Sequence, residues 1–393
     1  RFRNVTGVQT CALPISGMAG VNMRFGLKNQ NTYVNTTFKN VINKSWLYFV
    51  GFSLSNNDDD VTWDTLISTR NDKRVQGRGE LIYAAGNRFK MVIGSELQHF
   101  QYRQVFDTLT GQFTEMLSAG YVEADIIPFR NFAIKPGVRA EYSKLLARGN
   151  ISPRLAMAIK TSKFSQISLA SGYFYQLASQ NYLMQGYRPN FQEALHLMAN
   201  YQIIAKNRIF RLEGYYKSYS QLIREHGVPY TPNAFRFNYG MVDNSGSGYA
   251  QGIDVFWRDK KSIKNFDYWI SYSYIDTKRL YQNYVAKVTP DYVSDHNLNV
   301  VMKYFSMKLQ TSFSLTYSYA SGRPYYNPTN TRFLGDRSPD YHNLAFTAAY
   351  LTTIKKMFTV FYLSLDNITN QHNVLGYRYS YDGSQRYEVK PPF

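Results

Sequence analysis

Several common features are scarce or missing in this chain of 393 residues. It has one cysteine, Cys11, so no disulfide can form within the chain and metal-thiolate motifs are excluded. No apolar run approaches the roughly 18 residues of a membrane-spanning helix, which excludes an α-helical membrane protein. The six histidines include no pair with metal-ligand spacing, and H-E-x-x-H does not occur. The glycines of residues 244–248 precede no expected helix, so they do not form a phosphate loop.

Aromatic and basic residues are abundant instead. Aromatics make up 17% of the chain, with 35 Tyr and 26 Phe, and Tyr suits a membrane interface because its ring lies against acyl chains while its hydroxyl stays hydrated. The net charge of +18 raises the question of nucleic-acid binding. Many of the basic residues instead stand at short turns and form no stripe interleaved with aromatics. We therefore expect no nucleic-acid partner, and we interpret these residues as hydrated side chains gathered at one edge of the fold. These residues are Lys44, Arg88, Arg130, Lys160, Lys163, Lys206, Arg208, Lys260, Lys261, Lys264, Lys308, Lys355 and Lys356.

Alternating side chains indicate β-strands. In residues 312–319, S-F-S-L-T-Y-S-Y, large apolar side chains alternate with hydroxylated ones, and the strand period of two separates them onto opposite faces. One side of 209–219 carries charged residues that only a water-filled lumen tolerates beside an apolar face. Residues 190–205 contain some helix-favouring side chains, but their place between a loop and a turn favours a strand. We count about 17 strands. Further alternating segments are 46–54, 167–175, 195–203, 268–274 and 344–350.

Short turns and long polar loops alternate along the chain. Outer-membrane barrels keep short turns on the periplasmic side and long loops outside the cell, whereas a soluble meander has no reason for this asymmetry. The sequence therefore predicts an all-β fold, a transmembrane antiparallel up-and-down β-barrel; a soluble sandwich or solenoid, with its apolar faces covered by protein, is the alternative. Short turns are predicted at 43–44, 86–88, 128–131, 161–163, 206–207, 260–264, 305–307 and 353–356. Long polar connections are predicted at 56–77, 103–111, 148–152, 178–190, 223–248, 281–295, 321–340 and after residue 370.

The ends of the sequence depart from this pattern. Residues 1–16 (RFRNVTGVQTCALPIS) have no strand period and do not form a signal peptide; they resemble translated sequencing-adapter read-through. We therefore expect a non-native segment at 1–16 and a partial barrel domain over 17–393. A first strand near 21–27 and a last one near 359–365 should lack a ladder between them, because bacterial barrels close with an even strand number. Residues 374–389 are predicted to form a hairpin that turns at Asp382-Gly383.

Three short motifs follow one another in the last third: ASGRPYY at 320–326, DRSPDYHNL at 336–344 and LSLDNITN at 363–370. With ISPR at 151–154, their order and spacing resemble the C-terminal barrel part of TonB-dependent outer-membrane receptors of the type abundant in Bacteroidetes. This resemblance implies a receptor in the bacterial outer membrane, among lipid and lipopolysaccharide, that imports a scarce nutrient (a siderophore, glycan or peptide). It also implies contact with the TonB complex through an N-terminal segment. We expect that segment, the plug domain, the first strands and the closing strand to be missing from this sequence.

No catalytic arrangement is evident, so we expect no enzyme, no cofactor and no metal site. His296 and His342 are expected to be hydrated rim residues. The run 57–60 (NDDD) lacks the ligand spacing and glycine of a calcium loop and is expected to be a solvated loop tip. A passive porin or structural barrel, and a soluble β-rich carbohydrate-binding protein, remain the alternatives for function.

The long-loop side carries aromatic and cationic residues suited to ligand recognition. They would stack on sugar rings or bind an anionic iron chelate. A general interface belt in contact with lipopolysaccharide is the alternative explanation for the same residues. The candidates for an unknown small ligand are Tyr187, Arg188, Tyr230, Arg236, Arg323, Tyr325 and Tyr326, with Phe235 beside them.

Overall fold

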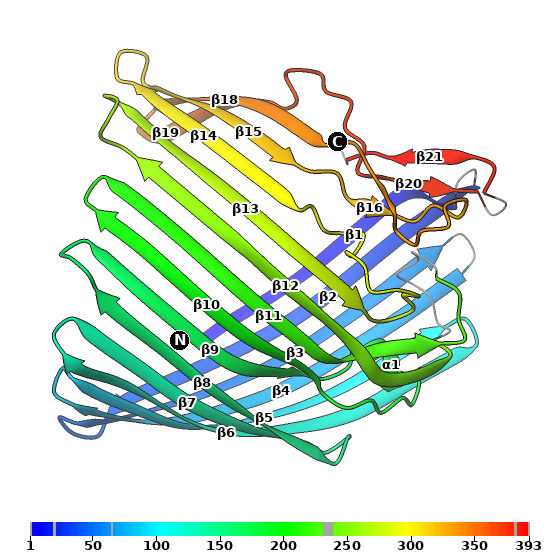
Figure 1. Ribbon diagram of the computed structural model, residues 1–393, viewed down its shortest axis with the longest axis horizontal. Coiled ribbons are helices and arrows are strands. Elements are labelled where there is room, and N and C mark those ends of the chain that lie inside the picture. Colours follow the sequence, from blue (N-terminus) through cyan, green and yellow to red (C-terminus); the bar gives the residue numbers. More distant parts are fainter. Residues whose placement is uncertain (1, 19–20, 64–65, 231–238, 381–382, 392–393) are drawn as a thin grey trace.

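The computed structural model describes residues 2–18, 21–63, 66–230, 239–380 and 383–391, and a 17-stranded antiparallel sheet makes up most of them (Figure 1). This confirms the predicted all-β, up-and-down fold and its strand number. Residues 190–205 lie mainly in strand β10, as predicted. The strands are β1 (Phe2–Met18), β2 (Val21–Val41), β3 (Trp46–Trp63), β4 (Leu66–Ala85), β5 (Phe89–Phe106), β6 (Leu109–Phe129), β7 (Phe132–Ser143), β8 (Arg148–Lys160), β9 (Ser165–Gln176), β10 (Gln192–Ala205), β11 (Arg208–His226), β12 (Met241–Asp259), β13 (Phe266–Leu280), β14 (His296–Ser306), β15 (Thr311–Ala320), β18 (Tyr341–Ile354) and β19 (Met357–Leu365).

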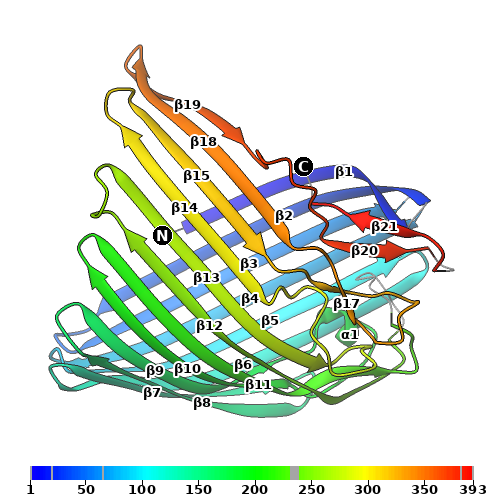
Figure 2. The same ribbon diagram turned by 45° about the horizontal axis from the view of Figure 1, so that its top comes forward.

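The sheet curls into a wall that surrounds a lumen. In Figures 1 and 2 the strands from β2 to β6 lie behind those from β10 to β15, and their directions cross. Consecutive strands pair antiparallel from β1 to β15, then β15 pairs with β18 and β18 with β19. Over the residues that the structure describes, β1 has a residue-by-residue register with β2 alone and β19 with β18 alone.

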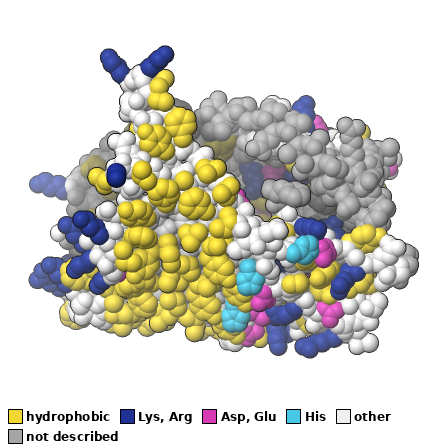
Figure 3. Space-filling view, turned by 90° about the horizontal axis from the view of Figure 1, so that it is seen from above, with side chains coloured by type: hydrophobic (Ala, Val, Ile, Leu, Met, Phe, Trp, Pro, Cys, Tyr) yellow, Lys and Arg dark blue, Asp and Glu magenta, His cyan; other side chains and the backbone are white. Residues whose placement is uncertain are grey.

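The outer face of the sheet is apolar and uncovered. Val50, Phe52 and Leu54 of β3 share this face, and Ile270 and Tyr274 of β13 are each 37% exposed although they are large apolar side chains. Figure 3 shows a continuous field of hydrophobic side chains over the strands. In a soluble sandwich a second sheet would cover this face, so the soluble alternative is wrong and the face is one that meets lipid.

The predicted short turns lie at one end of the sheet, at the left of Figure 1, and the long loops lie at the other end. At that loop end, however, β5 and β6 are joined by residues 107–108 alone, and β7 and β8 by residues 144–147 alone. The predicted short turns are confirmed, and the long connections at 281–295 and 321–340 lie between strands as expected. The second of these contains a small hairpin of β16 (Pro324–Tyr325) and β17 (Asp336–Arg337). The predicted hairpin near the end of the chain is formed by β20 (Gly376–Tyr379) and β21 (Arg386–Val389). Gly383 in its turn has a φ of +72°, which glycine adopts readily, whereas Asp382 lies outside the described residues.

Four predicted loops are wrong because strands continue through them. Residues 56–77 belong largely to β3 and β4, 103–111 to β5 and β6, 148–152 to β8, and 223–248 in part to β11 and β12. In β3 and β4 the polar side chains pair across strands: the Nε of Arg70 donates to Asp59 at 2.7 Å, and Asn71 donates to Asn56 at 3.0 Å. The run 57–60 is therefore part of β3, and its side chains alternate between the two faces instead of forming a loop tip.

Besides the β16–β17 hairpin, two elements were not predicted. Helix α1 (Gln180–Met184) is a single turn inside the loop at 178–190. No helix in the described part of the chain is long and apolar enough to cross a membrane. Strand β1 occupies Phe2–Met18 although that segment lacks a strand period; its ladder with β2 uses backbone groups, which do not depend on side-chain alternation. That residues 1–16 are non-native and that the barrel domain spans 17–393 remain predictions.

Candidate functional site

The inner face of β4 to β7 carries charged side chains that pair across strands. The Nε of Arg78 donates to Glu80 at 3.1 Å and to the hydroxyl of Tyr121 at 2.9 Å, and that hydroxyl donates to Glu80 at 2.6 Å. Arg139 lies between two carboxylates, with Nη2 3.1 Å from Glu96 and 2.6 Å from Glu141. Each cation thus has a nearby anion, which lowers the cost of removing both from bulk water.

A small polar cavity opens within this network. Its volume is about 140 Å³, and Arg78, Tyr121, Glu123, Arg139 and Arg154 line it with Gly137 and Val138. The guanidinium of Arg154 lies 4.7 Å from the ring centre of Phe174. In the described part of the chain the Nε of Arg154 is buried without a hydrogen-bond partner. The cavity therefore offers donors and acceptors of both signs on the lumen wall.

Charged residues spaced two apart were the sequence signal for this wall. The prediction used that signal for Arg211, Glu213 and Lys217, and the register confirms one shared face, because Glu213 pairs with Asn200 and with Asp254. The same spacing occurs in β4, where charged or polar residues stand at 74, 76, 78 and 80, but sequence reasoning missed it. The inner faces of β13, β15 and β18 differ in their middle parts, because these carry small uncharged side chains. These include Ser271, Ser273, Ser314, Thr316, Ser318, Ala345 and Thr347.

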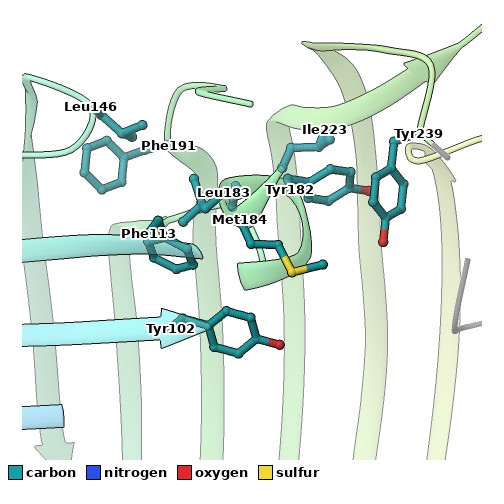
Figure 4. Packing of buried hydrophobic residues seen from close by; sticks show 10 residues of the cluster. Tyr102, Phe113, Leu146, Tyr182, Leu183, Met184, Phe191, Ile223 and Tyr239 are labelled. Carbon is teal, nitrogen blue, oxygen red and sulfur yellow. The ribbon is translucent and has the colours of Figure 1, made fainter. Parts of the chain in front are cut away.

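At the loop end, α1 folds inward against β5 and β6 (Figure 4). Leu183 is 1% exposed and packs in one cluster with Tyr102 and Phe113, which come from the ends of β5 and β6. The hydroxyl of Tyr182 donates to the buried carboxylate of Glu225. Burial of these apolar side chains holds the loop against the ends of β5 and β6.

Tyr187 and Arg188 follow directly after α1. The hydroxyl of Tyr187 donates to the carbonyl of Gly240 at 2.7 Å, and its ring meets that of Tyr239 edge-on at 6.4 Å. The Nη1 of Arg188 donates to the carbonyls of Leu183 and Tyr187 at 2.9 and 2.8 Å, while its side chain is exposed. Tyr187 is thus an anchor for the loop, and Arg188 presents a cation to the solvent.

A second aromatic cluster joins three loops. The ring of Tyr230 lies 4.9 Å from that of Tyr326, 4.9 Å from Phe333 and 5.7 Å from Tyr284. Its hydroxyl donates to Asp291 at 3.2 Å. Burial, and then the neighbouring Asp291 carboxylate, raise the pKa of Tyr230, and burial also raises the pKa of Tyr284. Both phenols therefore stay protonated well above neutral pH, and that of Tyr230 acts as a hydrogen-bond donor to Asp291.

The SGRP and DRSP motifs contact each other through the β16–β17 hairpin. The N–H of Ser338 donates to the carbonyl of Arg323 at 2.9 Å, and the N–H of Arg323 donates to the Ser338 hydroxyl at 3.0 Å. Position 322 requires glycine, because an added Cβ would lie 1.8 Å from the Ser338 carbonyl oxygen. Arg337 pairs with Asp295 of the preceding loop at 2.7 Å. The two motifs thus form one structural unit, which sequence reasoning did not anticipate.

The candidate ligand residues do not converge on one point. Tyr230 and Tyr326 come together, but Tyr325 points elsewhere, is 9% exposed and packs 5.0 Å from Tyr377 of β20. Arg323 donates from Nε to Ser294 at 3.2 Å. Tyr187 and Arg188 belong to the α1 loop, and Arg236 and Phe235 lie outside the described residues. Tyr182, Tyr239, Tyr284 and Phe333 were missed; their only sequence signal was an aromatic residue in a long loop.

His296 and His342 occupy matching positions on the outer face. The hydroxyl of Tyr272 and the Nδ1 of His296 are 2.9 Å apart, and the same distance separates Tyr317 from His342. Both histidines are partly buried at the loop side of the apolar face. Among the residues that the structure describes, no three His, Cys, Asp or Glu side chains are grouped to hold a metal ion.

Comparison with known proteins identifies the fold. No family model matches the chain, and no curated protein matches its sequence. Its structure is similar to the ferric citrate transporter FecA in the unliganded form, with a TM-score of 0.69 and 12% identity over 94% of this chain and 60% of FecA. For the outer membrane transporter YddB from Escherichia coli the TM-score is 0.66 and the identity 12%, over 95% of this chain and 66% of YddB. For the ferric-catecholate import receptor Fiu from E. coli K12 the TM-score is 0.70 and the identity 8%, over 93% of this chain and 63% of Fiu.

Identities this low show the fold alone. The chain spans 60–66% of the length of these three transporters. It therefore has the fold of outer-membrane transporters, and that fold together with the uncovered apolar face places it in the bacterial outer membrane.

Proposed function

We propose that the chain is the barrel portion of a TonB-dependent receptor, of the Bacteroidetes type, that imports a scarce nutrient such as a siderophore, a glycan or a peptide. The observation that carries the proposal is the combination of a wide sheet, a charged inner wall and long aromatic loops folded over one end. The likeness to an import receptor and a ferric citrate transporter supports it. The whole receptor would be longer than this chain, with a plug domain in the lumen and a TonB-binding segment ahead of it.

We propose that the ligand binds on the loop side between the α1 loop and the cluster around Tyr230. Arg188 would contribute an exposed cation, and Tyr326 an aromatic face beside Arg323. Tyr187 and Tyr230 line the same side and hold the loops in place, and Arg236 remains a candidate. Contact with Tyr325 would require the β20–β21 hairpin to move, because that hairpin now covers its ring. Surrounding lipid and lipopolysaccharide would contact the outer face.

The upstream reading frame tests the receptor proposal. We expect a plug-like domain in the same frame, and saturable binding when the complete protein is tested with ferric citrate, a ferric catecholate and maltoheptaose as probes. Replacing both Arg188 and Tyr326 with Ala should weaken binding of the recognised probe at least about tenfold, because a desolvated contact contributes about 1–2 kcal/mol. The control Lys73→Ala, on the outward face of β4, should leave it unchanged. A signal peptide that runs directly into barrel strands, with unselective solute passage, would instead indicate a passive porin.

A further inference from the structure

The end of the sheet with the short turns is strongly basic, and the proposed receptor function makes no use of this. At this end of the sheet, every turn between β2 and β19 carries at least one exposed Lys or Arg. We call these side chains the short-turn rim. Dark blue side chains gather at the left edge of the molecule in Figure 3, the side on which Figure 1 places the turns. The short-turn rim consists of Lys44, Arg88, Arg130, Lys160, Lys163, Lys206, Arg208, Lys260, Lys261, Lys264, Lys308, Lys355 and Lys356.

Carboxylates do not neutralise this rim. In the part of the chain that the structure describes, only two rim cations are paired, Arg208 with Asp259 and Lys260 with Asp267. The other carboxylate pairs near the turns use cations of the strands, because Asp125 pairs with Lys135, and Asp267 also pairs with Arg258. For the other rim cations, no carboxylate of the described residues lies within ion-pair distance. A surplus of positive charge therefore faces outward at one end of the sheet.

The same turns expose large apolar side chains. Phe129 is 67% exposed, Met307 74% and Phe358 73%, although each stands next to or close to a rim cation. The Nζ of Lys163 lies 5.5 Å from the ring centre of Phe164, which is also exposed. These residues continue the apolar outer face of the strands up to the charged tips. An apolar side chain directly below a cation matches the boundary between acyl chains and headgroups.

We propose that the short-turn rim binds the anionic phospholipid headgroups of the leaflet on the turn side, which by the rule for outer-membrane barrels is the periplasmic leaflet. The distribution favours lipid over a protein partner. A protein docks on one patch, whereas the rim cations occur at successive turns all along the curved sheet, and lipid surrounds a barrel in the same way. This inference depends on the membrane fold and not on which nutrient the receptor imports.

Lipid selectivity at the protein boundary tests the proposal. The full chain is reconstituted in phosphatidylcholine membranes, and the relative association of spin-labelled phosphatidylglycerol and phosphatidylcholine is measured by electron spin resonance. One Lys or Arg close to an anionic surface favours binding by roughly fivefold. Averaged over the whole lipid boundary, we expect a preference for phosphatidylglycerol of about two- to fivefold. In about 1 M salt, where the screening length is near 3 Å, the ratio of phosphatidylglycerol to phosphatidylcholine association should fall towards one, which means no preference.

Two matched variants locate the effect. Replacing Lys261, Lys264, Lys355 and Lys356 with Gln should remove about a third of the excess preference for phosphatidylglycerol, because they are four of the eleven rim cations without a carboxylate partner among the described residues. The control variant should retain the preference for phosphatidylglycerol. It replaces four exposed lysines of the loop end with Gln: Lys28, Lys73, Lys278 and Lys287. Equal loss in both variants, or no preference in the unaltered chain, would overturn the proposal. Absence of lipid preference combined with rim-dependent binding of polyglutamate would overturn it in favour of an acidic protein partner.

Discussion

Gly322→Ala should separate the β16–β17 hairpin while leaving the large sheet intact. An added Cβ would lie 1.8 Å from the carbonyl oxygen of Ser338, and real Cβ atoms essentially never come within 3.0 Å of such an atom. The two backbones must therefore move apart by at least 3.0 − 1.8 = 1.2 Å at this point. No flexible side chain can absorb the displacement, because the obstructing atom belongs to the backbone.

Such a movement breaks the hydrogen bonds that join the two motifs. The Ser338 N–H to Arg323 carbonyl bond is 2.9 Å, the Arg323 N–H to Ser338 hydroxyl bond is 3.0 Å, and the Gly322 N–H to Asp340 bond is 2.9 Å. Lengthened by about 1.2 Å, each exceeds bonding distance. At about 1 kcal/mol for each bond the local loss is about 3 kcal/mol, which corresponds to roughly 100-fold faster exchange of these amide hydrogens.

Hydrogen exchange of the full chain in detergent micelles measures this loss. The amides of Arg323 and Ser338 should lose protection, whereas amides in the middle of β13 should not. Gly376→Ala is the matched control, because it lies at the same end of the sheet and an added Cβ there meets nothing within 4 Å. Unchanged exchange at Arg323, or an equal change in the control, would refute the steric argument.

Three further changes should have measurable effects. Arg139→Met leaves two lumen carboxylates without their shared cation and should lower the free energy of unfolding, measured in urea, by about 2 kcal/mol. The control Arg103→Met, at an exposed arginine, should change that free energy by less than about 0.5 kcal/mol. Equal effects of the two substitutions would show that the ion pairs of Arg139 do not stabilise the protein. Tyr182→Phe removes the bond to buried Glu225 and should lower protection of the α1 amides about tenfold, and no change would show that the bond is dispensable. Because burial raises the pKa of Tyr230, the stability contributed by its protonated form is fully present below about pH 10 and is lost as the pH rises above that value. Ultraviolet titration of tyrosinate should show one fewer late-ionising group in Tyr230→Phe than in the unaltered chain. Ionisation of Tyr230 at the usual pH of a tyrosine would disprove the burial.

The strands that cross the membrane could be predicted because lipid on one side and water on the other enforce a period of two. The stretch 312–319 shows this, since its apolar and hydroxylated side chains separate onto the two faces of β15. Turn positions followed from the same pattern. The extension of β3 and β4 beyond the membrane could not be predicted, because both faces are polar there and the period disappears. The backbone register in the structure, from Asn56 opposite Lys73 to Thr62 opposite Ile67, shows that the ladder continues.

Contacts between loops could not be predicted from the sequence, for a different reason. Tyr230 and Tyr326 are both loop tyrosines, but their meeting depends on how three loops fold over the lumen, and Tyr325 turns away from its own neighbour because β16 is extended. The duplicated Tyr–His pairs could have been found. Y-S-Y at 272–274 and again at 317–319 each precedes a strand with H-N-L at or next to its start, at 296–298 and 342–344. Antiparallel pairing of consecutive strands then places each His beside a Tyr.

The positive charge of the chain is divided between two environments with different physical requirements. On the inner wall, cations such as Arg78 and Arg139 are partly dehydrated, so each is paired with carboxylates and contributes little to the outward field. At the turns the lysines are hydrated and, apart from Lys260, have no carboxylate of the described residues within ion-pair distance, so most of their charge remains uncompensated. A large part of the net charge of +18 therefore lies at the short turns, and it does not form a stripe that could track a nucleic-acid backbone. Under the lipid proposal this concentration also favours one orientation, because turning the barrel over would move the cations away from the anionic leaflet.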